Sequence, residues 1–284
     1  MRITVLSGKG GVGKSSIAAS LAIALSRRHS IICADCDVDA ANLALVLGLK
    51  ECSVKAISTS KKASFRHCTR SSCRKCLECC YFNAIEWYGR PSLKKFSCEG
   101  CGVCEMVCPE KSVKLVPYNN ATIMEGMTSY GFSVVSAQLK IGESGSGRVV
   151  TEVITRAAGY TADIMLVDSA AGIGCPVIAS VAGSDYAVIV TEPTPSALAD
   201  MKRAIEIVQH FRIPYGIVIN KYDLNRKISA RVEASKVLTR IPYDISFVSA
   251  LVSLTPVINT NPRIESIFVR LAAKLGTLKG HAPA

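Results

Sequence analysis

Nine cysteines lie between Cys68 and Cys108, and their close spacing makes this region the best candidate for metal chemistry. The second group, from Cys98 to Cys108, has the spacing C-x2-C-x2-C-x3-C-P that is typical of iron–sulfur ligands. Thiolates suit iron because they are soft ligands. A phosphate-binding motif starts at residue 8, which leaves no room before it for a cleaved secretory segment. We therefore expect a cytoplasmic, reducing location, where the cysteines hold metal rather than form disulfides.

The cysteine spacing resembles that of two-cluster ferredoxins, in which the fourth cysteine of each run ligates the other cluster. The resemblance implies two [4Fe–4S] clusters with exchanged fourth ligands. One set of ligands is then Cys98, Cys101, Cys104 and Cys80. The other set is Cys68, Cys73, Cys76 and Cys108.

The first cysteine run is less regular than the second. Cys73-x2-Cys76-x3-Cys80 fits the pattern, but the next expected position holds an arginine, which cannot ligate iron. Cys68 lies two residues farther away, and a slightly longer loop can still close the site. Cys79 is left over, as an inert thiol or an alternative ligand. A four-cysteine zinc site or a three-iron cluster is the alternative for this run.

A glycine-rich run near the start of the chain is the second candidate for chemistry. Residues 8–15 are Gly-Lys-Gly-Gly-Val-Gly-Lys-Ser, and they lie between an expected strand and an expected helix. Glycines allow successive N–H groups to point at phosphate oxygens. Lys14 supplies a positive charge to the β- and γ-phosphates, and the Ser15 hydroxyl is placed to coordinate Mg2+. The predicted nucleotide-binding residues here are Gly8, Gly10, Gly11, Val12, Gly13, Lys14, Ser15 and Ser16.

Lys9 distinguishes this run from an ordinary phosphate loop. With Lys9, the motif resembles the deviant Walker A motif of the MinD/ParA/nitrogenase-iron-protein ATPases. In that family the extra lysine reaches across a nucleotide-sandwiched dimer to the phosphates of the other subunit. The resemblance implies ATP as the nucleotide and a homodimer that forms at least when ATP is bound. It also makes Lys9 a catalytic residue acting in trans, beside Lys14.

Three later motifs resemble the same family. Residues 37–42, Asp-Val-Asp-Ala-Ala-Asn, match its switch I pattern, which implies that Asp39 orients or activates the attacking water. Asp168 follows an apolar run and matches the Walker B aspartate, so the implied Mg2+ ligands are Ser15, Asp37 and Asp168. Residues 220–223, Asn-Lys-Tyr-Asp, resemble the base-contacting motif and add Asn220 and Asp223 to the ATP site.

The cysteine-rich insert and the deviant loop together resemble one branch of this superfamily, the MinD-like ATPases with an inserted ferredoxin domain. Residues 143–148, 174–176 and 191–194 also resemble that branch. Cys175 lies seven residues beyond Asp168, the offset of a switch II cluster ligand in the nitrogenase iron protein. That protein uses two such cysteines per subunit, and no other cysteine here matches the second position. We therefore expect Cys175 to be a small buried thiol.

Strand and helix patterns alternate outside the cysteine region. The predicted strands are 2–7, 31–34, 132–139, 164–167, 186–190 and 215–219, and the predicted helices are 15–28, 40–47, 196–211 and 263–278. This alternation predicts an α/β fold with a mostly parallel sheet and helices on both faces. The resemblance implies a MinD-like P-loop NTPase with an inserted α+β ferredoxin-like domain that holds two clusters. We place the insert at 58–118 and the ATPase domain at 1–57 and 119–284.

The charge and hydropathy of the chain limit the classes of partner that it can bind. The formal charge is +12, and two four-thiolate clusters would lower it to about +8. Basic pairs flank the cysteines, either as solvated surface or to steer an acidic partner, and no nucleic-acid-binding motif is present. The longest apolar stretch, 17–25, is too short to span a bilayer. The amphipathic segment 263–278 fits a membrane-surface helix or a helix packed on the sheet, and we predict the latter.

These features predict an iron–sulfur protein that binds and hydrolyses Mg-ATP. Nucleotide-driven dimer rearrangement would be coupled either to electron transfer to a partner protein or to assembly and delivery of a metallocluster for it. The expected cofactors are ATP, Mg2+ and two [4Fe–4S] clusters. The alternative is a positioning or regulatory protein of the MinD type, controlled by nucleotide and redox state.

Overall fold

The computed structural model describes residues 1–66, 68 and 73–280 of the 284-residue chain. The chain forms two compact units. The first, called the large unit below, comprises Met1–Val54, Ile123–Gln138 and Ser146–Ala284. The second, called the cysteine unit, comprises Lys55–Thr122 and Leu139–Gly145.

The cysteine unit includes a segment that we had expected in the ATPase domain. The predicted insert ended at residue 118, but Leu139–Gly145 also belongs to the cysteine unit. Two contacts inside that unit explain why: the Lys140 N–H donates to the Asn120 carbonyl at 2.9 Å, and Lys62 Nζ lies 2.6 Å from Glu143 Oε1. A motif-based boundary misses such a segment because it is distant in sequence from the cysteines.

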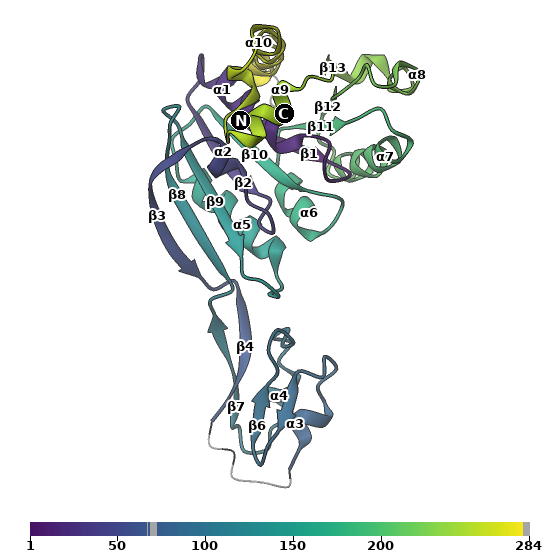
Figure 1. Cartoon of the computed structure of the whole chain (residues 1–284). Helices are drawn as coiled ribbons and strands as arrows, with labels where there is room; N and C mark the ends of the chain where they lie inside the picture. Colours follow the sequence, from purple (N-terminus) through teal and green to yellow (C-terminus); the bar gives the residue numbers. More distant parts are fainter. Residues whose placement is uncertain (67, 69–72, 281–284) are drawn as a thin grey trace. The chain divides into compact units, whose positions relative to one another are not determined.

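A nine-stranded sheet forms the centre of the large unit, in the order β13-β12-β11-β1-β10-β2-β9-β8-β3 (Figure 1). The seven strands from β13 to β9 pair in parallel, which confirms the predicted sheet. These strands are β1 (Arg2–Ser7), β2 (Ile31–Cys36), β9 (Ser133–Leu139), β10 (Ile164–Ala171), β11 (Tyr186–Thr191), β12 (Tyr215–Ile219) and β13 (Val237–Arg240).

Two strands at one edge of the sheet were not predicted. They are β3 (Leu49–Ile57) and β8 (Ala121–Thr128), and both extend into the cysteine unit. Nearly all of β3 is exposed, so its sequence lacks the alternation of apolar and polar residues that marks a half-buried strand.

Helices cover both faces of the sheet because its central strands have apolar side chains on both sides. Ile3 and Val5 of β1 belong to the core on one face, whereas Leu6 belongs to the core on the other. The first face is covered by α1 (Lys14–Ser26), α2 (Leu43–Val46), α9 (Ser246–Val252) and α10 (Pro262–Gly276). The second is covered by α6 (Cys175–Val181) and α7 (Pro195–His210), with α5 (Ser146–Ala158) packed beside α6. The remaining helical elements are α8 (Arg226–Ser229) and the 3-10 turns η1 (Ala234–Lys236), η2 (Val257–Asn259) and η3 (Thr277–Gly280).

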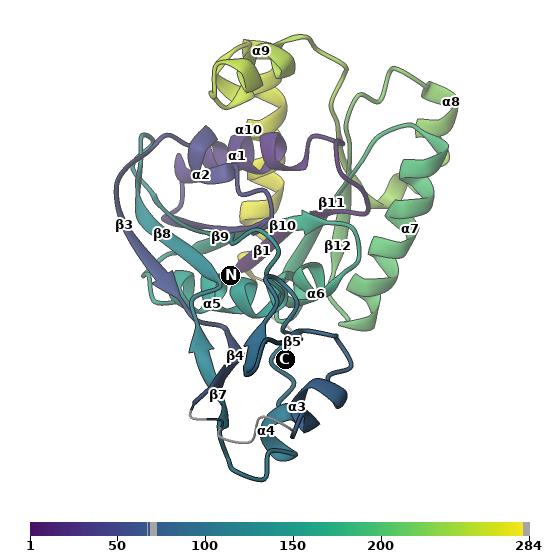
Figure 2. The ribbon, with the colours of Figure 1, turned by 60° about the horizontal axis from the view of Figure 1, so that its bottom comes forward.

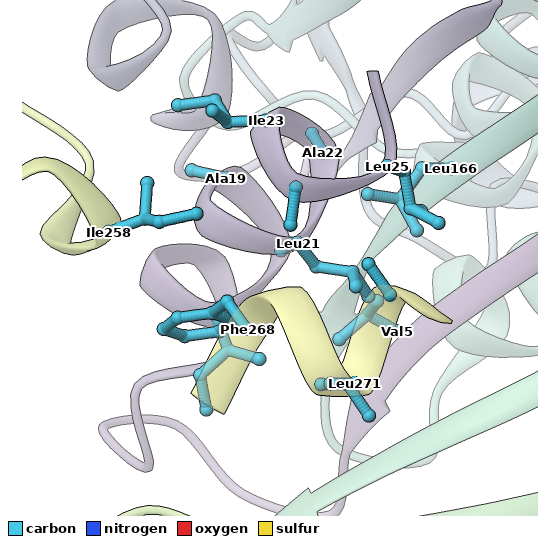
Figure 3. Close-up of a cluster of buried hydrophobic side chains, with 14 of the residues drawn as sticks. Val5, Ala19, Leu21, Ala22, Ile23, Leu25, Leu166, Ile258, Phe268 and Leu271 are labelled. Carbon is cyan, nitrogen blue, oxygen red and sulfur yellow. The ribbon is translucent and has the colours of Figure 1, made fainter. Parts of the chain in front are cut away.

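The amphipathic segment near the C-terminus packs on the large unit, as predicted. Phe268 and Leu271 of α10 are buried against Leu21 of α1 (Figure 3). No helix among the described residues is both long enough and apolar enough to cross a membrane.

The helix after β2 is shorter than predicted. We expected residues 40–47, but α2 covers Leu43–Val46. The Asn42 amide donates to the Ala40 carbonyl at 2.8 Å, and this local bond competes with helix formation. Residues 37–42 therefore form a loop before the helix.

The cysteine unit is built from short elements around a small core. Two antiparallel pairs, β4 (Ser60–Phe65) with β7 (Val113–Tyr118) and β5 (Ile85–Trp87) with β6 (Pro91–Leu93), accompany two one-turn helices, α3 (Lys75–Glu78) and α4 (Val103–Met106). The two helices lie side by side (Figures 1 and 2). Cys76 and Cys104 belong to the buried core with Ile85.

Candidate functional site

The predicted nucleotide residues, together with Glu192, come from the carboxyl ends of five neighbouring parallel strands. The phosphate loop follows β1, the switch I loop follows β2, and Asp168 lies in β10. Glu192 and Asn220 follow β11 and β12. In parallel α/β sheets, ligands bind at this edge. The fold therefore gathers motifs as distant in sequence as residues 8–15 and 220–223.

The phosphate loop leads directly into the first turn of α1. Gly13 caps the helix in the left-handed region, with φ of 89°, and no side chain caps the first turn. A Cβ atom at Gly13 would lie 2.6 Å from the Asn220 amide nitrogen, and one at Gly8 would collide with the Asp200 carbonyl. Glycine is needed at both positions, and the helix N–H groups remain available for phosphate oxygens.

Lys14 is almost completely buried among acidic groups. Its Nζ lies 2.7 Å from Asp168 Oδ1, 3.7 Å from Asp37 Oδ2 and 3.2 Å from Ser15 Oγ. Burial alone would lower the pKa of Lys14, but its attraction to Asp168 and the hydrogen bond between them outweigh this effect and raise the pKa. The lysine is therefore held as a cation at the base of the loop.

Asp168 has one carboxylate oxygen without a partner. Oδ1 accepts from Lys14, whereas the buried Oδ2 has no hydrogen-bond partner among the described residues. A buried carboxylate oxygen normally has a donor, a water or a cation beside it. The nearby oxygens of Asp37 and Ser15 are hard ligands of the kind that Mg2+ accepts, so this donor set fits a magnesium ion.

Asp35 is a buried acidic group that sequence analysis did not select. Its Oδ2 accepts the Leu43 N–H and the Ser136 hydroxyl, both at 3.1 Å. Burial, and then repulsion from Asp168, raise the pKa of Asp35 to about 7. The spacing Asp-x-Asp-x-Asp at 35–39 was the available signal; Asp35 lay just past the predicted strand 31–34, whereas the structure includes it in β2.

The structure brings Asp37 rather than Asp39 beside Lys14. The Asp39 side chain is exposed, and its backbone carbonyl accepts from the Gln138 amide at 3.2 Å. Asp37 is only partly exposed and faces the Lys14 ammonium. The carboxylate predicted to orient water therefore lies outside the group of charges around Lys14.

Lys9 is held by an acidic residue of the same chain. Its Nζ lies 3.0 Å from Glu192 Oε1, while Lys221 Nζ lies 3.0 Å from Glu192 Oε2. Burial would raise the pKa of Glu192, but hydrogen bonds from both lysines hold it below its usual value. Lys9 retains 31% side-chain exposure, so it is partly accessible from outside the loop.

The predicted base-contacting residues are engaged with protein groups. The Asn220 amide donates to the Val12 carbonyl at 2.8 Å, and its oxygen accepts the Lys221 N–H. Asp223 Oδ1 accepts the Tyr243 N–H at 2.7 Å. Asn220 thus braces the phosphate loop, a role that its sequence motif did not indicate.

The eight predicted cluster ligands line two separate cavities of the cysteine unit. One cavity includes Cys68, Cys73, Cys76 and Cys108 in its lining. The other includes Cys80, Cys98, Cys101 and Cys104. The lining of each cavity includes three cysteines of one run and one cysteine of the other.

The two cysteine runs have matching local geometry. The Ala84 N–H donates to Cys80 Sγ at 3.3 Å, and the Ser112 N–H donates to Cys108 Sγ at 3.2 Å. Three residues after each of these cysteines, Asn83 and Lys111 have positive φ angles of 49° and 52°. The duplication seen in sequence therefore extends to backbone conformation and to N–H···S contacts, which stabilise thiolates.

The remaining cysteines lie outside both cavities. Cys79 donates its S–H to the Cys76 carbonyl at 3.4 Å. Cys33 and Cys36 are fully buried in β2. Cys175, which we expected to be buried, is exposed, because the first turn of α6 leaves its side chain on the surface.

No group of three or more His, Cys, Asp or Glu side chains within the described part of the chain is arranged to hold a single metal ion.

Comparison with known proteins places the chain in a family. The CobQ/CobB/MinD/ParA nucleotide binding domain matches residues 3–257. An uncharacterized protein of Methanocaldococcus jannaschii is 34% identical over 276 residues, covering 97% of this chain and 96% of its own length. An iron-sulfur cluster carrier protein of Pyrococcus horikoshii is 26% identical over 299 residues, covering 96% of this chain and 85% of its own length.

A solved structure shows the same fold. The septum site-determining protein MinD of Pyrococcus horikoshii, complexed with Mg-ADP, has a TM-score of 0.64 and 21% identity. The match covers 98% of this chain and 97% of that structure. The chain therefore belongs to the CobQ/CobB/MinD/ParA family of nucleotide-binding proteins, in which the MinD/ParA members are ATPases.

Proposed function

We propose that the protein hydrolyses Mg-ATP and couples this reaction to iron–sulfur clusters held by its cysteine unit. The observation that carries the proposal is the sorting of eight cysteines into two four-cysteine cavities, in a chain that also carries a phosphate loop. A nucleotide switch alone would not require such cavities, and a simple ferredoxin would not require the loop.

Residues of the large unit account for nucleotide binding. The N–H groups of the loop and of the first turn of α1 bind the phosphates, and Lys14 moves from Asp168 to the β- and γ-phosphates. Ser15, Asp37 and Asp168 would hold Mg2+, which would neutralise charge on the phosphates. Asn220 and Asp223 border the base site while they brace adjacent loops.

Hydrolysis requires a positioned water and added positive charge. We assign the orientation of the attacking water to the exposed Asp39, since Asp37, beside Lys14, is assigned to Mg2+. Lys9 leaves Glu192 and stabilises the transition state across an ATP-dependent homodimer. Its partial exposure supports such a movement.

The cysteine cavities fit [4Fe–4S] clusters. Each offers four soft thiol ligands, apolar walls and one N–H···S contact already in place. Cys68, Cys73, Cys76 and Cys108 would hold one cluster, and Cys80, Cys98, Cys101 and Cys104 the other. When bound, such clusters supply one-electron transfer.

Electron transfer to a partner protein is the use that the cavities favour. Two sets of four internal ligands are suited to resident clusters rather than to a labile scaffold. Nucleotide-driven rearrangement of the dimer would then control when the partner receives an electron. The basic residues of the chain suit an acidic partner.

Cluster assembly or delivery is the second candidate, supported by the similarity to an iron-sulfur cluster carrier protein. The similarity to MinD supports a third use, in which nucleotide and redox state control where the protein binds. Identification of the partner protein would distinguish among these three uses.

Anaerobic purification, followed by iron and sulfide analysis, tests the cluster proposal. We expect about eight irons per chain, with ATP hydrolysis that depends on Mg2+. One zinc per chain and no iron would refute it. A capture experiment with and without ATP then identifies the partner. A redox protein that becomes reduced would support electron transfer, whereas an apo-protein that gains iron would support cluster delivery.

A further inference from the structure

The chain passes between the two units at four points. Two of them lie in the edge strands β3 and β8, after Val54 and after Thr122. The other two flank Leu139–Gly145, the short segment that returns to the cysteine unit. This second pair of crossings adjoins residues that contact the loops of the nucleotide site.

On its N-terminal side, the segment is tied to switch I. The Ser136 hydroxyl of β9 donates to the buried Asp35 carboxylate at 3.1 Å. The Gln138 amide, the last side chain before the crossing, donates to the carbonyls of Val38 and Asp39 at 3.3 and 3.2 Å. A movement of the switch I loop therefore acts directly on the end of β9.

Within the cysteine unit, the segment is held by a partly buried ion pair. Lys62 Nζ lies 2.6 Å from Glu143 Oε1, and the two side chains are only 13% and 5% exposed. The same ammonium lies 4.1 Å from the centre of the Tyr118 ring. Pairs so shielded from water are stronger than surface pairs, because the solvent screens them less.

Backbone contacts strengthen this attachment. The Lys140 N–H donates to the Asn120 carbonyl at 2.9 Å, and the Asn120 amide donates to the Ser144 carbonyl at 3.3 Å. Gly142, at φ of 74°, has no room for a Cβ because Phe96 packs against it. The segment is thus a fixed part of the cysteine unit rather than a loose connection.

On its C-terminal side, the chain returns beside residues 172–175, where the loop after β10 leads into α6. Gly147 lies against Cys175, so that a Cβ atom at Gly147 would be 3.3 Å from the Cys175 carbonyl oxygen. Cys175 begins α6 directly after residues 172–174, which follow the Asp168 strand. Helices α5 and α6 also pack together.

We propose that residues 138–147 transmit the nucleotide state of the large unit to the cysteine unit. Gln138 acts as the positioning residue at switch I, and the Lys62–Glu143 pair anchors the segment at the other end. The continuous backbone carries the coupling, so no contact between the units is required. The proposal rests on the proposed function for the identity of the nucleotide, and it explains how ATP would control the clusters.

Hydrogen exchange of the full-length, anaerobically purified protein, with and without Mg-ATP, tests the coupling. In the wild type, we expect ATP to change the exchange of peptides containing Thr59, Asn120 and Lys140 by about 5- to 150-fold, the usual range of coupling between sites. Lys62→Met and Glu143→Gln should each reduce this change to less than about twofold, because the anchor is lost. Gln138→Ala should reduce it as well, by releasing switch I.

A matched control and a rescue separate coupling from general destabilisation. Lys114→Met removes a more exposed pair with Glu105 in the same unit and should leave the ATP response intact. The exchanged pair, Lys62→Glu with Glu143→Lys, should restore the response even if the single variants fold poorly. ATP hydrolysis without a partner should be unchanged in the Lys62 and Glu143 variants.

Two outcomes would overturn the coupling. One is ATP protection of residues 8–15 without any response of the cysteine unit in the wild type. The other is a full response in a folded Glu143→Gln variant. Loss of ATP protection at residues 8–15 in the wild type would instead refute the nucleotide part of the proposed function, so the two failures are distinguishable.

Discussion

The two units of this protein are held together by different kinds of interaction. In the large unit, two apolar cores cover both faces of the sheet, and the polar site lies at the strand ends. In the cysteine unit, the small core contains Cys76 and Cys104 themselves. The candidate ligands of the second unit are therefore part of its core, whereas those of the first are additions to a core that is complete without them.

This difference predicts how each unit depends on its ligand. A small core buries too little apolar surface to offset the loss of chain entropy, so metal binding must supply folding free energy. The large unit needs no ligand to fold, but it concentrates like charges around Lys14. Ligand loss should unfold the cysteine unit and leave the large unit intact.

Removal of one cluster ligand should have the largest effect. Cys104→Ser should lower iron from about eight to about four per chain, because one four-cysteine cavity is broken. Metal binding contributes on the order of 10 kcal/mol in small metal-dependent domains, so the amides of the cysteine unit should also lose protection from hydrogen exchange.

Cys79→Ser is the matched control for this loss. Its thiol lies beside the ligands but outside both cavities, and iron content should not change. Iron loss equal to that of Cys104→Ser would make Cys79 a ligand.

Substitution of Lys14 tests the large unit. Lys14→Ala should reduce ATP hydrolysis by about 10³-fold, since a positioned charge at the phosphates is lost. It also leaves the Asp168 and Asp37 carboxylates without their cation, at a cost of about 3–5 kcal/mol in the free energy of unfolding of the large unit. Iron content should stay at the wild-type value, and a parallel loss of iron would contradict the independence of the two units.

Substitution of Lys9 tests whether this residue contributes to hydrolysis in trans without contributing to folding. Lys9→Ala should lower kcat by about 10²-fold, as expected for a lost transition-state contact, with little change in the thermal midpoint. Turnover per chain in the wild type should rise with protein concentration, as a dimeric site requires. Wild-type turnover that is independent of concentration, or normal turnover in Lys9→Ala, would remove the role in trans.

The smallest effect concerns Glu192. Its pKa is lowered in the folded protein, so the folded state binds fewer protons than the unfolded state around this pKa. The contribution of Glu192 to stability is present above the ordinary glutamate pKa of about 4.3 and is lost as the pH falls through the lowered value. Urea unfolding of Glu192→Gln at several pH values should therefore differ most from the wild type near neutral pH and converge with it in acid. A constant difference would contradict the ionic role.

Particular residues show how far the sequence could be interpreted. Arg2–Ser7 and Tyr215–Ile219 have the predicted bounds, because a strand buried on both faces leaves a continuous apolar run. β3 was missed because an exposed edge strand leaves no such pattern. Asp37 and Asp39 were assigned to Mg2+ and to the attacking water on motif spacing, and only the structure shows that Asp37 lies 3.7 Å from the Lys14 ammonium.

The sequence by itself determined the parallel sheet, the phosphate loop and the two cysteine runs, because these depend on local periodicity and spacing. Only the tertiary structure decided that Asp35 is buried beside the site, that Asn220 braces Val12, and that Glu192 joins two lysines. It also decided that Leu139–Gly145 belongs with the cysteines. These features join residues distant in the chain, and burial and charge pairing act through space rather than along the sequence.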